Sequence, residues 1–132
     1  MALSIGIGLA LAVSAFARWL GLDRDRAFYP TVMMVIAFLY VLFAAMGGTA
    51  ALPIEAIIGL GFATLAALGF TKSPWFVVVA LIGHGLFDIA HPHAIENGGV
   101  PVWWPDFCSA YDVTAGLWLA LQHYRSRAAA SP

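Results

Sequence analysis

Charged residues are scarce in this chain. Asp, Glu, Lys and Arg make up only 10% of its 132 residues, whereas a soluble domain usually carries about 25%. Hydrophobic residues account for 62% of the sequence. This composition excludes an ordinary water-soluble fold, and it predicts a single all-α domain, residues 1–132, whose solvent is the lipid bilayer.

Positive charge and cysteine are also in short supply. Six basic residues stand against seven acidic ones, so the formal net charge is −1, and no cationic surface is available for nucleic acid. The chain has one cysteine, Cys108, which excludes a disulfide within one copy. A small apolar filler is the ordinary role of such a residue, and a ligand role is the alternative.

Basic residues are missing ahead of the first apolar run, where a secretory signal peptide carries them. The first one, Arg18, comes near the end of that run instead. We therefore interpret residues 3–20 as a retained transmembrane helix. A spanning helix needs about 20 mostly apolar residues. The qualifying segments predict a bundle of five transmembrane helices, at residues 3–20, 28–46, 50–70, 74–90 and 105–124.

The distribution of the basic residues tests this segmentation. With five spans, all six fall on the same side of the membrane, and they are Arg18, Arg24, Arg26, Lys72, Arg125 and Arg127. Because basic residues concentrate on the cytoplasmic side, we expect an N-terminus outside and a C-terminus in the cytoplasm, in the inner (cytoplasmic) membrane of the cell. A four-span topology, the alternative, would scatter these charges over both sides.

Three of the four histidines lie in one short stretch, GHGLFDIAHPHAIENGG at residues 83–99. His84, Asp88 and His91 are spaced by four and three residues, so they share one face of the predicted helix. At 1.5 Å per residue, His84 lies about 10 Å deeper in the membrane than His91. Asp112 reaches a similar depth on the last predicted helix.

Polar groups gathered at one depth favour a binding site. A charged group inside a membrane costs about 2.5 to 3.5 kcal/mol on insertion scales, so several together need partners or a polar cavity. Neutral imidazoles and carboxylates are ligands that zinc and iron(II) take in proteins. We therefore predict a divalent metal site, zinc or iron, in the outer half of the bilayer, facing the periplasm or exterior. The candidate ligands are His84, Asp88, His91, Asp112 and His93, and the candidate catalytic bases are Glu55 and Asp106.

Several of these residues also have a simpler interpretation. Pro92 should break the helix after His91, which turns His93 back toward the site or into a solvated loop. Glu55 and Asp106 follow prolines near helix starts, where an acid complements the helix dipole. The same polar groups would also serve a metal-free proton or substrate site, or simple structural pairing.

Two segments, SPWFVVVALIGHGLFDIAH at residues 73–91 and VPVWWPDFCSAYD at residues 100–112, resemble a family of small bacterial integral-membrane proteins with no assigned function. That family shares an HGLFD-like motif followed by a P-x-W-x-P-x-F-C-x-x-Y-D segment. The resemblance implies a bacterial membrane protein, and it implies no activity.

Three functions fit these observations. The first is a membrane-embedded metalloenzyme, open to the exterior, that acts on a small apolar or lipid-like substrate. The second is a small proton- or cation-coupled transporter or channel, which would need a homo-oligomer because five helices in one copy are few. Toward the cytoplasm the helices offer little beyond Ser14, Tyr40, Thr64 and Thr114, so no continuous polar path is predicted. The third is a non-catalytic accessory subunit whose polar groups hold its helices together.

Overall fold

The computed structural model describes residues 1–129, and the regular structure of these residues is entirely helical. The helices are α1 (Ala2–Leu20), α2 (Phe28–Ala37), α3 (Leu39–Gly47), α4 (Leu52–Thr71), α5 (Trp75–Ala94) and α6 (Trp104–Ala129). The prediction of an all-α fold is confirmed. The predicted segments overlap these helices, but α5 and α6 each extend about one turn further at their C-terminal ends.

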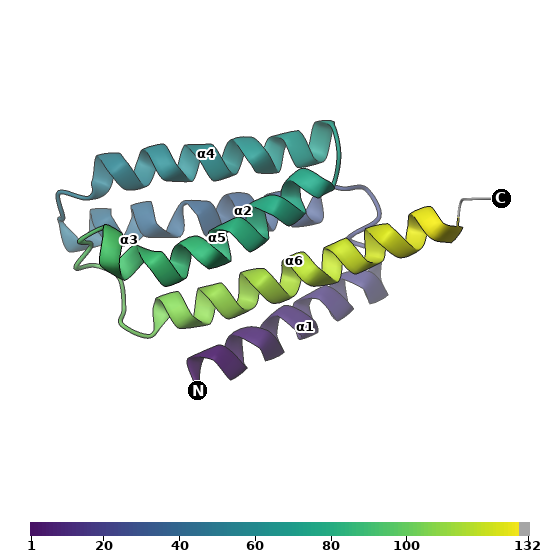
Figure 1. The fold of residues 1–132 in the computed structure, drawn as a ribbon, viewed down its shortest axis with the longest axis horizontal. Helices are drawn as coiled ribbons and strands as arrows, with labels where there is room; N and C mark the ends of the chain where they lie inside the picture. The colour runs from purple at the N-terminus through teal and green to yellow at the C-terminus, as the bar shows by residue number, and fades with distance from the viewer. Residues whose placement is uncertain (130–132) are drawn as a thin grey trace.

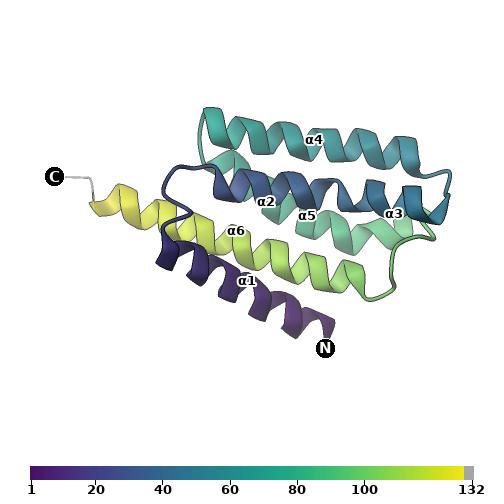
Figure 2. The same ribbon diagram turned by 180° about the vertical axis from the view of Figure 1, so that it is seen from behind.

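The helices lie lengthwise side by side, and α2 and α3 follow one another as a single interrupted rod (Figure 1). Helix α6 packs between α1 and α5, while α4 packs against α5 and against both α2 and α3. The view from behind shows α1 at the edge of the bundle, next to α6 (Figure 2). The start of α1 and the end of α6 lie at opposite ends of the bundle (Figure 1).

Four stretches are long and apolar enough to cross a membrane, namely Ala2–Leu20, Phe28–Gly47, Leu52–Thr71 and Trp75–Ala94. The second of them comprises α2 and α3. The fifth predicted span, α6, does not meet the same criterion, because polar side chains such as Asp112 and Gln122 lower its hydropathy. Asp112 is nevertheless buried, since α1 and α5 flank this helix.

The outside of the bundle is apolar. On α1 the buried positions hold the small residues Gly6, Ala10, Ser14 and Ala17, whereas the side chain of Phe16 is 54% exposed. Large exposed hydrophobic side chains occur on every helix. Water would disfavour such a surface, whereas lipid tails solvate it. The surface therefore favours a membrane environment.

Two helix irregularities differ from the sequence prediction. Phe38 separates α2 from α3, and its N–H bonds to the carbonyl of Val35 in a 3₁₀-type turn. The predicted break at Pro92 is wrong, because α5 continues through this residue to Ala94. A proline in the last turn removes only one intrahelical hydrogen bond, and the backbone becomes extended at Ile95 instead.

The two ends of the bundle differ in charge. All six basic residues lie at the end where α1, α4 and α6 finish, and they are Arg18, Arg24, Arg26, Lys72, Arg125 and Arg127. The other end holds the N-terminus, the α3–α4 connection and the α5–α6 loop, with the acidic residues Glu96 and Asp106. This separation is the asymmetry expected of a bundle with five passes.

Candidate metal centre

Helices α5 and α6 bring His84 and Asp112 face to face. The Nδ1 atom of His84 lies 2.7 Å from Oδ2 of Asp112, and the two residues are 1% and 0% exposed. Gly85 permits this approach, since a Cβ atom there would lie 3.0 Å from the carbonyl oxygen of Ser109 and 3.2 Å from Cβ of Asp112. The sequence predicted a similar depth for His84 and Asp112, and in the structure the two side chains are in direct contact.

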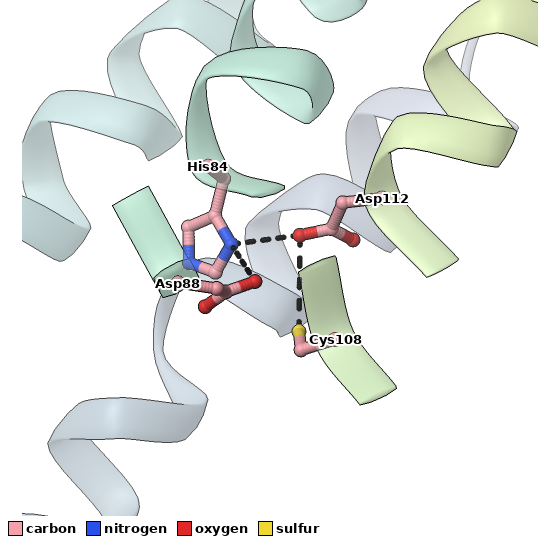
Figure 3. Close-up of side chains that lie close together, drawn as sticks. All are labelled: His84, Asp88, Cys108 and Asp112. Carbon is pink, nitrogen blue, oxygen red and sulfur yellow. Dashed lines mark hydrogen bonds and ion pairs between the residues drawn. The ribbon is translucent and has the colours of Figure 1, made fainter. Parts of the chain in front are cut away.

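Asp88 and Cys108 complete a group of four side chains, which we call the donor cluster. The Oδ2 atom of Asp88 lies 3.5 Å from Nδ1 of His84, and the Sγ atom of Cys108 lies 3.7 Å from Oδ2 of Asp112. One potential ligand atom from each of the four residues lies within 4.8 Å of the others. Figure 3 shows the four side chains pointing toward one another from α5 and α6. The donor cluster could therefore hold a metal ion.

The charges within the donor cluster do not balance by themselves. With both carboxylates ionised it carries two negative charges, and protonation of His84 removes only one of them. Asp88 Oδ2 and Asp112 Oδ1 are buried without a hydrogen-bond partner. Buried carboxylates need a counterion, hydrogen bonds or protons. A divalent cation would neutralise both, and the cluster offers it nitrogen, oxygen and sulfur donors.

A second buried network joins α4 to the end of α5. The Oε1 atom of Glu55 lies 2.7 Å from Nε2 of His91 and accepts a 2.8 Å hydrogen bond from the side-chain amide of Asn97. Asn97 also donates to the backbone carbonyl of Tyr40. Glu55 and His91 are 1% and 2% exposed, and Oε2 of Glu55 is buried without a hydrogen-bond partner. This Glu55 network is a polar site beside the donor cluster.

Tyr40 links the donor cluster to the Glu55 network. Its hydroxyl donates a 2.7 Å hydrogen bond to Oδ1 of Asp88, and its ring stacks on the imidazole of His91 with the centroids 4.0 Å apart. The prediction that places Tyr40 on the cytoplasmic side of the polar groups is wrong. Residue 40 lies in α3, toward the end of the bundle that holds the α3–α4 connection.

The structure brings together only some of the predicted site residues. Of the predicted ligands, His91 lies against Glu55 and outside the donor cluster, whereas Cys108 belongs to the donor cluster. His93 is exposed, since α5 stays helical here and a residue two positions beyond His91 faces the opposite side. Asp106 is also exposed and lies outside the donor cluster.

The sequence predicted no site role for Tyr40 or Asn97, and it indicated a ligand role for Cys108 only as the alternative. A signal existed for Cys108, because it precedes Asp112 by four residues and so shares its face of the helix. Asn97 stands before two glycines, which is typical of a turn. This pattern does not indicate that the Asn97 side chain donates hydrogen bonds to buried groups. Tyr40 lies in an apolar segment, and no local pattern indicates a partner 48 residues away.

Comparison with protein-family models, with curated proteins and with solved structures yields no match. The resemblance of residues 73–112 to small bacterial membrane proteins therefore stays a similarity of short motifs. Functional inference for this chain rests on the donor cluster and its surroundings.

Proposed function

We propose that the chain is a multi-pass protein of the inner membrane with five spans, formed by α1, α2 with α3, α4, α5 and α6. Three features support this topology: the apolar outer surface, the helices that are long enough to span a bilayer, and the six basic residues at one end. The basic end is then cytoplasmic. The donor cluster lies between the middle of the bilayer and its outer surface.

We further propose that the donor cluster binds a zinc ion. Imidazole nitrogen, thiolate sulfur and carboxylate oxygen are the donors that zinc takes in proteins, whereas magnesium and calcium prefer oxygen ligands. Iron(II) is the second choice for the same set. The observation that carries the proposal is the burial of four donor atoms within 4.8 Å of one another.

The function that this site supports best is an enzyme acting on a small apolar or lipid-like substrate. Zinc would supply Lewis-acid polarisation of an oxygen-bearing group. Glu55 is the candidate general base, because His91 holds one of its oxygens and the other has no hydrogen-bond partner. His91 and Asn97 line a pocket of about 330 Å³ with apolar neighbours such as Ile95 and Val100. This pocket is the proposed entrance for the substrate.

The metal content of the purified protein tests the zinc proposal. The detergent-purified full chain is analysed as wild type, His84→Ala and Asp112→Asn, with His93→Ala as the control, because His93 is an exposed histidine of the same helix. We expect about one zinc per chain in the wild type and in the control, and loss of most of it in the other two variants. A wild type that stays metal-free after incubation with zinc would contradict the proposal.

A proton-coupled transporter is the second candidate function. It is favoured by two buried hydrogen-bonded pairs, Glu55 with His91 and Tyr40 with Asp88. The stacked rings of Tyr40 and His91 bring these pairs together, so titratable groups extend from the pocket beside His91 toward the middle of the bundle. Proton flux into liposomes distinguishes the two candidates. Flux in metal-free wild type that disappears in Tyr40→Phe would replace the enzyme proposal, whereas zinc binding without flux would support it.

A further inference from the structure

A larger pocket opens at the basic end of the bundle. It encloses about 790 Å³, and its lining comes from the end of α1, the α1–α2 connection, the start of α2, the junction of α4 with α5, and the C-terminal half of α6. None of its lining residues belongs to the donor cluster. An inference about this basic pocket is therefore independent of the zinc proposal.

Positive charge dominates the basic pocket. Its lining includes Arg18, Arg24, Arg26 and Arg125. The one acidic lining residue, Asp23, lies 3.8 Å from Arg18 and accepts a hydrogen bond from Gln122. The other three arginines form no ion pair with a carboxylate within residues 1–129. Four arginines against one aspartate leave a formal net charge of +3 on the lining.

The basic pocket also has an apolar part. Val77, Leu119 and Trp118 contribute to its lining, and Val77 is buried whereas the arginines are exposed. The indole N–H of Trp118 is buried without a hydrogen-bond partner. Exposed positive charge beside buried apolar surface suits a ligand with an anionic head and an apolar tail.

We propose that the basic pocket binds a phosphate ester and that the headgroup of an anionic phospholipid supplies it. Guanidinium groups bind phosphate oxygens through paired, charge-assisted hydrogen bonds. Basic pockets between transmembrane helices on the cytoplasmic side bind anionic headgroups, and the topology proposed above places this pocket on that side. A phosphomonoester, with a charge of about −1.5 to −2, fits a lining with an excess of positive charge.

Arg26 provides a variant that separates binding from folding. Its φ of 65° lies in the left-handed region, which favours glycine over residues with a side chain. Arg26→Gly therefore removes a pocket arginine and relieves backbone strain at once. Arg125→Gln removes a second pocket arginine. Lys72→Gln is the matched control, because Lys72 is an exposed cation at the same end that does not line the pocket.

Thermal unfolding of the detergent-purified full chain measures binding, because a ligand that binds the folded state raises Tm. The titrated ligands are dioctanoyl phosphatidic acid, dioctanoyl phosphatidylcholine and inorganic phosphate. We expect phosphatidic acid to raise Tm of the wild type and of Lys72→Gln equally. Its Kd should rise about tenfold in Arg26→Gly and in Arg125→Gln, as expected for the loss of one charge-assisted contact.

The three ligands distinguish the possible sources of the phosphate. A response to phosphatidic acid that exceeds the responses to the other two supports a lipid headgroup. A response to inorganic phosphate that depends on Arg26 and Arg125 supports the phosphate site and assigns its ligand to a soluble compound. An equal response to phosphatidylcholine, or an equal loss of affinity in Lys72→Gln, would overturn the proposal.

Discussion

The buried carboxylates of this protein have more acceptor oxygens than donors to fill them. Glu55, Asp88 and Asp112 each keep one oxygen without a hydrogen-bond partner. The hydroxyl of Tyr40 is the donor that satisfies the other oxygen of Asp88. Besides His84, whose Nδ1 lies 3.5 Å from Oδ2 of Asp88, Tyr40 is therefore the side chain that compensates the charge on Asp88 within residues 1–129, through its 2.7 Å hydrogen bond.

Replacing Tyr40 with phenylalanine removes that donor and keeps the ring that stacks on His91. We expect Tyr40→Phe to lower the free energy of unfolding by about 1–3 kcal/mol, because a buried acceptor loses its partner. Thermal unfolding in detergent measures the change. Tyr124→Phe is the control, since Tyr124 is 67% exposed.

The same variant also tests whether Asp88 binds the metal. Added zinc should recover part of the lost stability of Tyr40→Phe, because the ion would compensate the carboxylate that has lost its donor. An unchanged difference between Tyr40→Phe and the wild type in the presence of zinc would count against Asp88 as a ligand.

The pairing of α5 with α6 assembles the donor cluster from two helices. Glycines at two levels permit the close approach: a Cβ atom on Gly85 would lie 3.0 Å from the backbone oxygen of Ser109, and one on Gly116 would lie 2.8 Å from the Ile82 side chain. At Gly85 the added Cβ atom would also lie 2.9 Å from a methyl group of Val113, and the backbone oxygen of Ser109 cannot rotate away as that side chain can. The distance between the two helices at His84 is therefore sensitive to one methyl group.

Gly85→Ala should separate α5 from α6 and loosen the contact between His84 and Asp112. We expect a loss of stability of about 1–3 kcal/mol, as for other overpacked sites, together with a lower zinc content. Gly83→Ala is the matched control, because a Cβ atom there would meet only Phe62, at an ordinary 3.7 Å. Unchanged stability and zinc content in Gly85→Ala would show that the helices do not depend on this close approach.

The whole molecule is a bundle with an apolar outer surface and with all six basic residues at one end. The donor cluster, the Glu55 network and Tyr40 lie on α3, α4, α5 and α6 and in the α5–α6 loop, and the outward-facing positions of the helices hold mainly apolar side chains. This arrangement is the reverse of a soluble helical bundle, whose polar residues face outward. In the proposed topology, the basic residues at one end place that end on the cytoplasmic side.

Cysteine labelling in spheroplasts tests the orientation. Gly98→Cys lies in the α5–α6 loop, where an added Cβ atom meets nothing within 4 Å, and Lys72→Cys lies at the basic end. We expect a membrane-impermeant maleimide to label Gly98→Cys in intact spheroplasts and Lys72→Cys only after lysis. The native Cys108 is buried and should stay unlabelled. The opposite pattern would invert the proposed topology and place the basic pocket outside.

Much of the fold follows from local sequence, because helix formation and hydropathy are properties of continuous segments. The predicted segments overlap the observed helices, and the spacing of His84 and Asp88 places both on one face of α5. The interruption at Phe38 had no such signal, since neither proline nor glycine lies beside it. The extension of α5 through Pro92 shows the limit of a local rule near a helix end.

Composition and spacing thus established an all-helical chain with an apolar exterior and a concentration of polar groups on α5. Which side chains meet was settled by packing: His84 contacts Asp112, His91 contacts Glu55, and Tyr40 reaches Asp88. Spacing along one helix cannot specify these contacts, because they depend on which helices are neighbours and on how each is rotated about its axis. Close contacts at small residues such as Gly85 determine which helices are neighbours and how each is rotated. These contacts form only when the bundle assembles.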